Sequence, residues 1–128
     1  MFWRGPERRK SVRVQIRMTV HVEIAGQPRF YEAVSRDLSV SGALLVLRRE
    51  LLHCTPIYVE FRLPGSLQTL YCPAHVVWAK DTMTSLAPER DASYLMGIEF
   101  VRPSRQARKE LKRFVAERLK VERKGQQA

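Results

Sequence analysis

The sequence contains few of the cysteines that hold small secreted domains together. Cys54 and Cys72 are the two cysteines in 128 residues, too few for a disulfide framework in a chain without an export signal. We therefore expect both to be reduced thiols in the core. His53 and His75 lie near them in the sequence. Residues adjacent or three apart on a strand point to opposite faces, so we expect no zinc site.

Long apolar segments are also missing. The longest uninterrupted run covers about six residues, 42–47, whereas a helix that spans a bilayer needs roughly 20. Charge and proline interrupt residues 1–6 before the apolar stretch of a secretory signal can develop. The sequence therefore predicts no membrane span and a cytoplasmic location.

The motifs of common enzyme sites are not visible. Residues 39–42 lack the glycine that precedes the serine of a nucleophile elbow, and the chain has neither a glycine-rich phosphate loop followed by Lys-Ser/Thr nor an HExxH zinc motif. We predict that the protein is not an enzyme and that it carries no cofactor or metal.

Acidic residues are the scarcer charge, and the excess of basic residues is uneven. The chain has 23 Lys and Arg against 13 Asp and Glu, a net charge of +10. Residues 1–17 hold six against one, residues 102–128 hold ten against three, and the 84 residues between them hold seven against nine. The ends thus carry +5 and +7 and the body −2. A basic arm on a nearly neutral body favours a compact anionic ligand over duplex DNA.

The hydropathy pattern predicts a mainly β chain. Apolar and polar residues alternate from Val12 to Ile24, which is typical of a long half-buried strand. Five further strands are expected at 29–36, 42–47, 57–63, 70–78 and 94–100. We expect their aromatic side chains Phe61, Trp78 and Phe100 to be buried.

After Pro103 the apolar residues recur every three or four positions, which predicts one amphipathic helix with Ser104 as its N-cap. Short strands without βαβ alternation favour a six-stranded antiparallel β-barrel, closed or nearly closed, flanked by this C-terminal helix. The length of 128 residues predicts one domain. We expect a flexible N-terminal arm at 1–7, the barrel with its helix at 8–122 and a frayed tail at 123–128.

Two polar clusters flank the first expected hairpin. Residues 8–13 read Arg-Arg-Lys-Ser-Val-Arg, and residues 37–42 read Asp-Leu-Ser-Val-Ser-Gly. An antiparallel hairpin brings its two ends together, so arginines, a carboxylate and hydroxyls should meet at one end of the barrel. This arrangement predicts a ligand site.

The two clusters resemble the signature of the PilZ family of bacterial cyclic di-GMP receptors. That signature is RxxxR followed about 20 to 30 residues later by [D/N]xSxxG. Arg9 to Arg13 match the first part and Asp37 to Gly42 the second, and the resemblance extends over about residues 7–119. It implies a PilZ-like split barrel that acts as a single-domain receptor.

The resemblance implies cyclic di-GMP as the ligand, bound by residues of the two clusters. The expected ligand-binding residues are Arg8, Arg9, Arg13, Asp37, Ser39 and Gly42. Arginine can pair with phosphate or with the guanine edge, and a carboxylate accepts from guanine N–H groups. Arginine at position 8, directly before RxxxR, is associated in the family with two bound ligand molecules.

The resemblance also implies a signalling role, in which binding changes the conformation of the N-terminal arm and an unidentified effector protein responds. Whether the chain forms a homodimer is left open. Two alternatives remain. One is a small basic barrel that binds single-stranded nucleic acid on a stacking platform, and the other is a PilZ-like module that acts by protein contact alone.

Overall fold

The computed structural model describes residues 12–82 and 93–127 of the chain, which form seven strands and one helix. The elements in chain order are β1 (Val14–Gln15), β2 (Thr19–Ile24), β3 (Phe30–Leu38), β4 (Gly42–Leu47), β5 (Pro56–Phe61), β6 (Leu70–Asp81), β7 (Tyr94–Phe100) and α1 (Arg105–Gln127).

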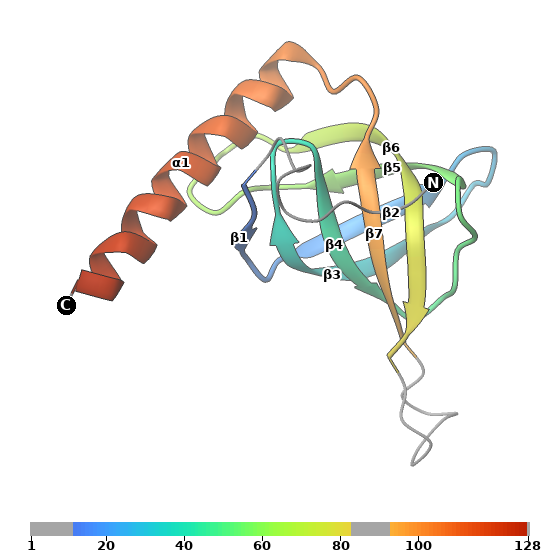
Figure 1. Cartoon of the computed structure of the whole chain (residues 1–128). Helices are drawn as coiled ribbons and strands as arrows, with labels where there is room; N and C mark the ends of the chain where they lie inside the picture. The colour runs from blue at the N-terminus through green and yellow to red at the C-terminus, as the bar shows by residue number, and fades with distance from the viewer. Residues whose placement is uncertain (1–11, 83–92, 128) are drawn as a thin grey trace.

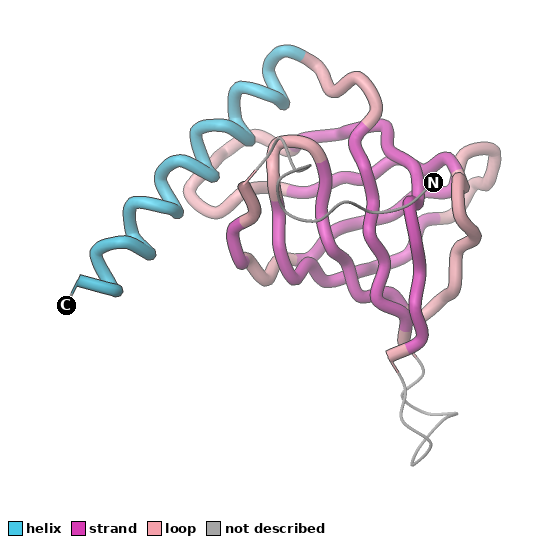
Figure 2. Tube along the Cα trace, in the orientation of Figure 1, coloured by secondary structure: helices cyan, strands magenta, loops and turns pink. Residues whose placement is uncertain are grey.

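Six of these strands close into an antiparallel barrel. Their hydrogen-bonded order is β3-β2-β5-β6-β7-β4, and the pairing of β3 with β4 closes the ring. The short strand β1 lies outside that ring and pairs with β3. Figures 1 and 2 show the barrel with α1 running diagonally along one side. The predicted fold, a six-stranded antiparallel barrel with one C-terminal helix, is confirmed.

The first strand differs from its prediction, because the segment 12–24 is divided into β1 and β2. Residues 16–18 lie between the two strands, where two backbone hydrogen bonds to β3 remain, from Ile16 N to Arg36 O and from Ser35 N to Met18 O, and the buried Ser35 side chain adds two more. Its hydroxyl accepts a hydrogen bond from the amide of Met18 at 3.0 Å and donates one to the carbonyl of Ile16. The side-chain alternation continues through this irregularity, so the apolar pattern could not reveal it.

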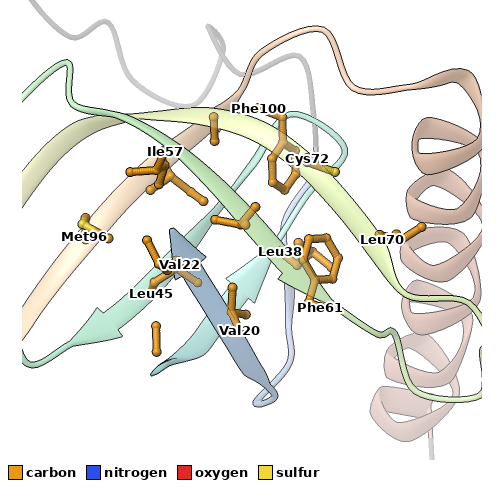
Figure 3. Packing of buried hydrophobic residues seen from close by; sticks show 14 of the residues in the cluster. Val20, Val22, Leu38, Leu45, Ile57, Phe61, Leu70, Cys72, Met96 and Phe100 are labelled. Carbon is orange, nitrogen blue, oxygen red and sulfur yellow. The ribbon is translucent and has the colours of Figure 1, made fainter. Parts of the chain in front are cut away.

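The core fills the barrel interior with inward-facing residues from all six of its strands (Figure 3). Phe61 and Phe100 are 4% and 7% exposed, as predicted, and their ring centroids lie 6.2 Å apart. Cys72 is fully buried, and burial raises the pKa of its thiol to about 11. The prediction for Cys54 was wrong, because this thiol is exposed in the turn before β5, where its φ is 69°.

The prediction that Trp78 is buried was also wrong. The residue is 39% exposed. The register of β6 on β7 shifts between Val76 and Trp78, and this irregularity moves the remainder of β6 out of the inward alternation. The indole therefore lies on the outer surface of the barrel.

Helix α1 begins as the sequence predicts. Ser104 Oγ accepts a hydrogen bond from the amide of Ala107 at 3.0 Å, which confirms Ser104 as the N-cap. Ala107, Leu111 and Val115 are buried. The helix continues to Gln127, past the boundary predicted at residue 122, and its C-terminal end projects beyond the barrel (Figure 1). Within the described residues, no helix is long and apolar enough to cross a membrane.

Candidate functional site

The fold brings the two signature clusters together through the pairing of β1 with β3. Gln15 lies opposite Asp37 in this antiparallel pair. Arg13, the residue before β1, therefore lies close to Asp37. Arg13 Nη1 lies 3.8 Å from Asp37 Oδ2. The Arg13 side chain is 40% exposed and that of Asp37 is 19% exposed. A cation and an acceptor thus share one end of the barrel at an accessible position.

Asp37 keeps unused hydrogen-bonding capacity. Its Oδ1 is shielded from solvent, and no described residue donates to it. A buried acceptor without a donor costs about 1 to 3 kcal/mol. Rotation about χ2 exchanges the two carboxylate oxygens of an aspartate, so either can turn toward the exposed side. The carboxylate is therefore ready to accept from a ligand N–H group.

Ser39 is 4% exposed and serves the turn between β3 and β4. Its Oγ accepts hydrogen bonds from the amides of Gly42 at 3.1 Å and Ser41 at 3.2 Å. Its own amide donates to the carbonyl of Gly42 at 2.8 Å. These contacts give Ser39 a positioning role, because they fix the end of β3 that carries Asp37.

Gly42 begins β4 and lies opposite Glu99 of β7. A Cβ atom placed on Gly42 would lie 2.1 Å from the carbonyl oxygen of Ile98, a distance that real contacts do not reach. The glycine is thus required by the close approach of the β7 backbone. This close approach holds β4, and with it the turn, against the barrel.

A row of cross-strand neighbours extends the site around the barrel. From β1 to β6 the paired residues are Gln15, Asp37, Leu44, Gly97 and Trp78. The indole of Trp78 occupies the space over Gly97, because a Cβ atom there would lie 2.5 Å from its Nε1. The alternation pattern had placed Trp78 in the core. The glycine opposite it on β7 is the sequence signal that could have located the indole outside.

A cleft of about 660 Å³ adjoins Asp37. Its lining includes Gln15 and Leu44 of this row together with Arg17, Arg36 and Arg118. Arg118 comes from α1, far from both clusters in the sequence. These three arginines were not among the predicted site residues.

The described residues contain no group of three or more His, Cys, Asp or Glu that could hold a metal ion.

Arg8 and Arg9 lie outside the described residues, so the structure places four of the six predicted site residues. Arg13 and Asp37 meet directly, whereas Ser39 and Gly42 build the turn beside them. The guanidinium of Arg13, a half-buried carboxylate and an indole in the same cross-strand row are groups that can contact a ligand with phosphates and aromatic bases.

The family model of the PilZ domain matches residues 7–117. This chain therefore belongs to the PilZ family. The match includes the whole barrel, both signature clusters and the part of α1 that packs on the barrel. A comparison with curated proteins finds no match.

Solved structures share the fold at low sequence identity. The PilZ domain of YcgR from Escherichia coli, solved with c-di-GMP, is 14% identical over 94% of this chain and 98% of that one, with a TM-score of 0.69. The inhibitor of motility MotI/DgrA from Bacillus subtilis is 17% identical, with a TM-score of 0.70, over 88% of this chain and 52% of that one. The complex of MrkH from K. pneumonia with c-di-GMP is 14% identical over 93% and 55%, with a TM-score of 0.67. This chain thus spans about half the length of the last two.

Proposed function

We propose that this chain is a receptor for cyclic di-GMP. The observation that carries the proposal is the meeting of Arg13 and Asp37, one residue from each half of the PilZ signature, with a carboxylate oxygen to which no described residue donates. Two structures with the same fold contain c-di-GMP, those of YcgR and MrkH.

The chemistry of the ligand suits these residues. Cyclic di-GMP has two phosphates and two guanines on one ring, and a guanidinium can pair with phosphate oxygens or with the O6/N7 edge of guanine. In this proposal Arg9 and Arg13 take those contacts. Asp37 accepts from the guanine N1–H and amino groups, and Ser39 and Gly42 hold the turn that positions Asp37.

Trp78 adds an aromatic surface to the proposed site. Its exposed indole belongs to the same cross-strand row as Asp37, separated from it by Leu44 and Gly97. A planar base can stack on such a ring while its edge reaches a carboxylate. The row is therefore suited to a purine more than to an isolated phosphate.

The receptor has no catalytic output in this proposal and signals through an effector. Ligand phosphates draw in the basic residues before Val12, the N-terminal arm changes its conformation, and the effector binds the new surface. Amide hydrogen exchange across residues 7–12 should slow when ligand is added. Equal exchange with and without ligand would contradict the role of the arm.

Binding of single-stranded nucleic acid is less well supported. The stacked aromatic pair on the outer barrel wall is Tyr58 and Tyr71, with ring centroids 5.4 Å apart. Tyr71 donates a hydrogen bond to Glu23 at 3.0 Å, and Glu60 lies opposite Tyr71. Carboxylates beside the stacking surface repel a phosphate backbone, so this wall does not offer the basic platform that such binding needs.

Isothermal titration of the full chain with cyclic di-GMP tests the proposal. We expect saturable binding that Asp37→Ala weakens by at least tenfold. Glu50→Ala, which removes an exposed carboxylate outside the site, is the matched control and should bind like the wild type. A folded wild-type chain that binds no cyclic di-GMP would overturn the receptor proposal and favour a module that acts by protein contact alone.

A further inference from the structure

The cleft beside Asp37 is richer in positive charge than the PilZ signature accounts for. Arg17, Arg36 and Arg118 line it, and Asp37 is the one carboxylate among the described residues of its lining. None of these three arginines forms an ion pair with another described residue. A cleft with three guanidinium groups and one carboxylate that is itself paired with Arg13 is suited to an anion.

Arg118 lies on α1 beside the stripe of residues that packs on the barrel. Ala107, Leu111 and Val115 follow one another at four-residue spacing and are buried. Leu119, four residues after Val115, continues this stripe, and Arg118, three residues after Val115, borders it at an exposed position. The exposed Arg118 therefore lies at the edge of the stripe that packs on the barrel, and it lines the cleft that contains Asp37.

The cleft shares Gln15, Asp37 and Leu44 with the cross-strand row that leads to Trp78. A ligand in the cleft can therefore extend along this row. Its volume of about 660 Å³ falls within the range of about 300 to 1,000 Å³ common for small-molecule sites. Planar guanidinium groups bind phosphate oxygens in a bidentate manner, more strongly than a single ammonium group does. A phosphodiester group is therefore the ligand chemistry that fits this cleft.

We propose that Arg118, with Arg17 and Arg36, forms a further phosphate-binding subsite, and that α1 contacts the bound nucleotide directly through Arg118. This inference rests on the proposed function, since the ligand is cyclic di-GMP. It assigns to the helix a contact that neither signature cluster contains. Arg118 links the occupancy of the site to the helix whose C-terminal end projects from the barrel (Figure 1).

Titrating cyclic di-GMP into matched variants of the full chain tests this subsite. Arg118→Gln and Arg108→Gln each remove one positive charge from an exposed position on α1, but only the first changes a residue that lines the cleft. We expect Arg118→Gln to weaken binding by about tenfold, the usual effect of one lost charge-assisted hydrogen bond, and Arg108→Gln by less than about twofold. Circular dichroism should show equal helix content in both variants.

A second variant separates a specific contact from general attraction. Arg118→Lys keeps the charge but loses the planar fork, so it should bind between Arg118→Gln and the wild type. Equal affinities of Arg118→Gln and Arg108→Gln, with a wild type that binds, would overturn the subsite and leave the receptor proposal standing. A wild type that does not bind cyclic di-GMP would overturn both.

Discussion

Arg13, the residue before β1, lies diagonally across from Asp37 of β3, with Nη1 and Oδ2 separated by 3.8 Å. That separation exceeds the usual length of a charge-assisted hydrogen bond, about 2.7 to 2.9 Å. Both side chains also retain access to solvent. Exposed ion pairs contribute about 0 to 1 kcal/mol to stability. The pair is therefore loose enough to exchange its mutual contact for contacts with a ligand, at little cost to the fold.

Removing the Arg13 side chain should weaken ligand binding and leave the stability of the fold almost unchanged. We expect Arg13→Ala to lower the affinity for cyclic di-GMP at least tenfold, because a lost hydrogen bond to a charged group costs about 1.5 to 3 kcal/mol. The melting temperature should change by no more than about 3 °C, since the Arg13 side chain is 40% exposed and lies 3.8 Å from Asp37. Calorimetric titration and thermal unfolding measure the two effects. Arg62→Ala, at an exposed position after β5, is the control and should change neither. Arg9→Ala should behave like Arg13→Ala, and tight binding by both variants would contradict the assignment.

Asp37 should determine which base the site accepts. Guanine presents N–H donors to a carboxylate, whereas adenine has no ring N–H on the corresponding edge, so its analogue leaves the buried acceptor unpaired. We expect cyclic di-AMP to compete poorly with cyclic di-GMP in the wild type. Asp37→Ala should reduce the ratio of the two affinities by at least tenfold. Equal displacement of labelled cyclic di-GMP by the two dinucleotides in the wild type would refute this basis for selectivity.

Gly42 should affect stability even without ligand. An added Cβ atom collides with the Ile98 carbonyl, and overpacking of this kind costs about 1 to 3 kcal/mol. We expect Gly42→Ala to lower the melting temperature by at least about 5 °C in the absence of ligand. Ser41→Ala, at the exposed neighbouring position, should change it by less than about 2 °C. An unchanged melting temperature in Gly42→Ala, together with lost binding, would instead indicate that Gly42 acts by leaving room for the ligand.

The two thiols should differ sharply in reactivity. Cys72 is buried and the pKa of its thiol is raised to about 11, so at pH 8 it is both protonated and shielded. Cys54 is exposed, and its Sγ lies 3.1 Å from His53 Nδ1. A thiol reagent should therefore label one cysteine per native chain at pH 8 and two after denaturation. Cys54→Ser should abolish the rapid native reaction. Rapid labelling that persists in Cys54→Ser would show that the barrel opens around Cys72.

The sequence predicts this fold well where the chain follows a regular period. Alternation identified most of the barrel strands, a short apolar run identified the strand at 42–47, and the serine before the last amphipathic segment identified the start of α1. Alternation fails where a bulge shifts the register within a strand, because the bulge changes the direction of the later side chains. Trp78 is the example, since the shift after Val76 exposes the indole that the pattern buries.

The residues of the candidate site also differ in how far the sequence predicts their positions. Arg13 and Asp37 could be paired from the sequence, because a hairpin joins its two ends. Arg118 could not, because its position beside Asp37 depends on how α1 crosses the barrel. No spacing rule in the sequence encodes that crossing. An arginine on an amphipathic helix is more often simply solvated.

Arg8 should determine how many ligand molecules the protein binds. Two cyclic di-GMP molecules can intercalate their guanines, and the resulting pair presents four phosphates that an additional guanidinium can contact or a base that it can stack on. We expect a calorimetric stoichiometry near two ligands per chain in the wild type and a lower value in Arg8→Ala. Lys10→Ala removes a nearby positive charge outside the signature arginines and should keep the value near two. A wild-type stoichiometry near one at saturating ligand would refute this role of Arg8, whereas the receptor proposal would still stand on the affinity itself.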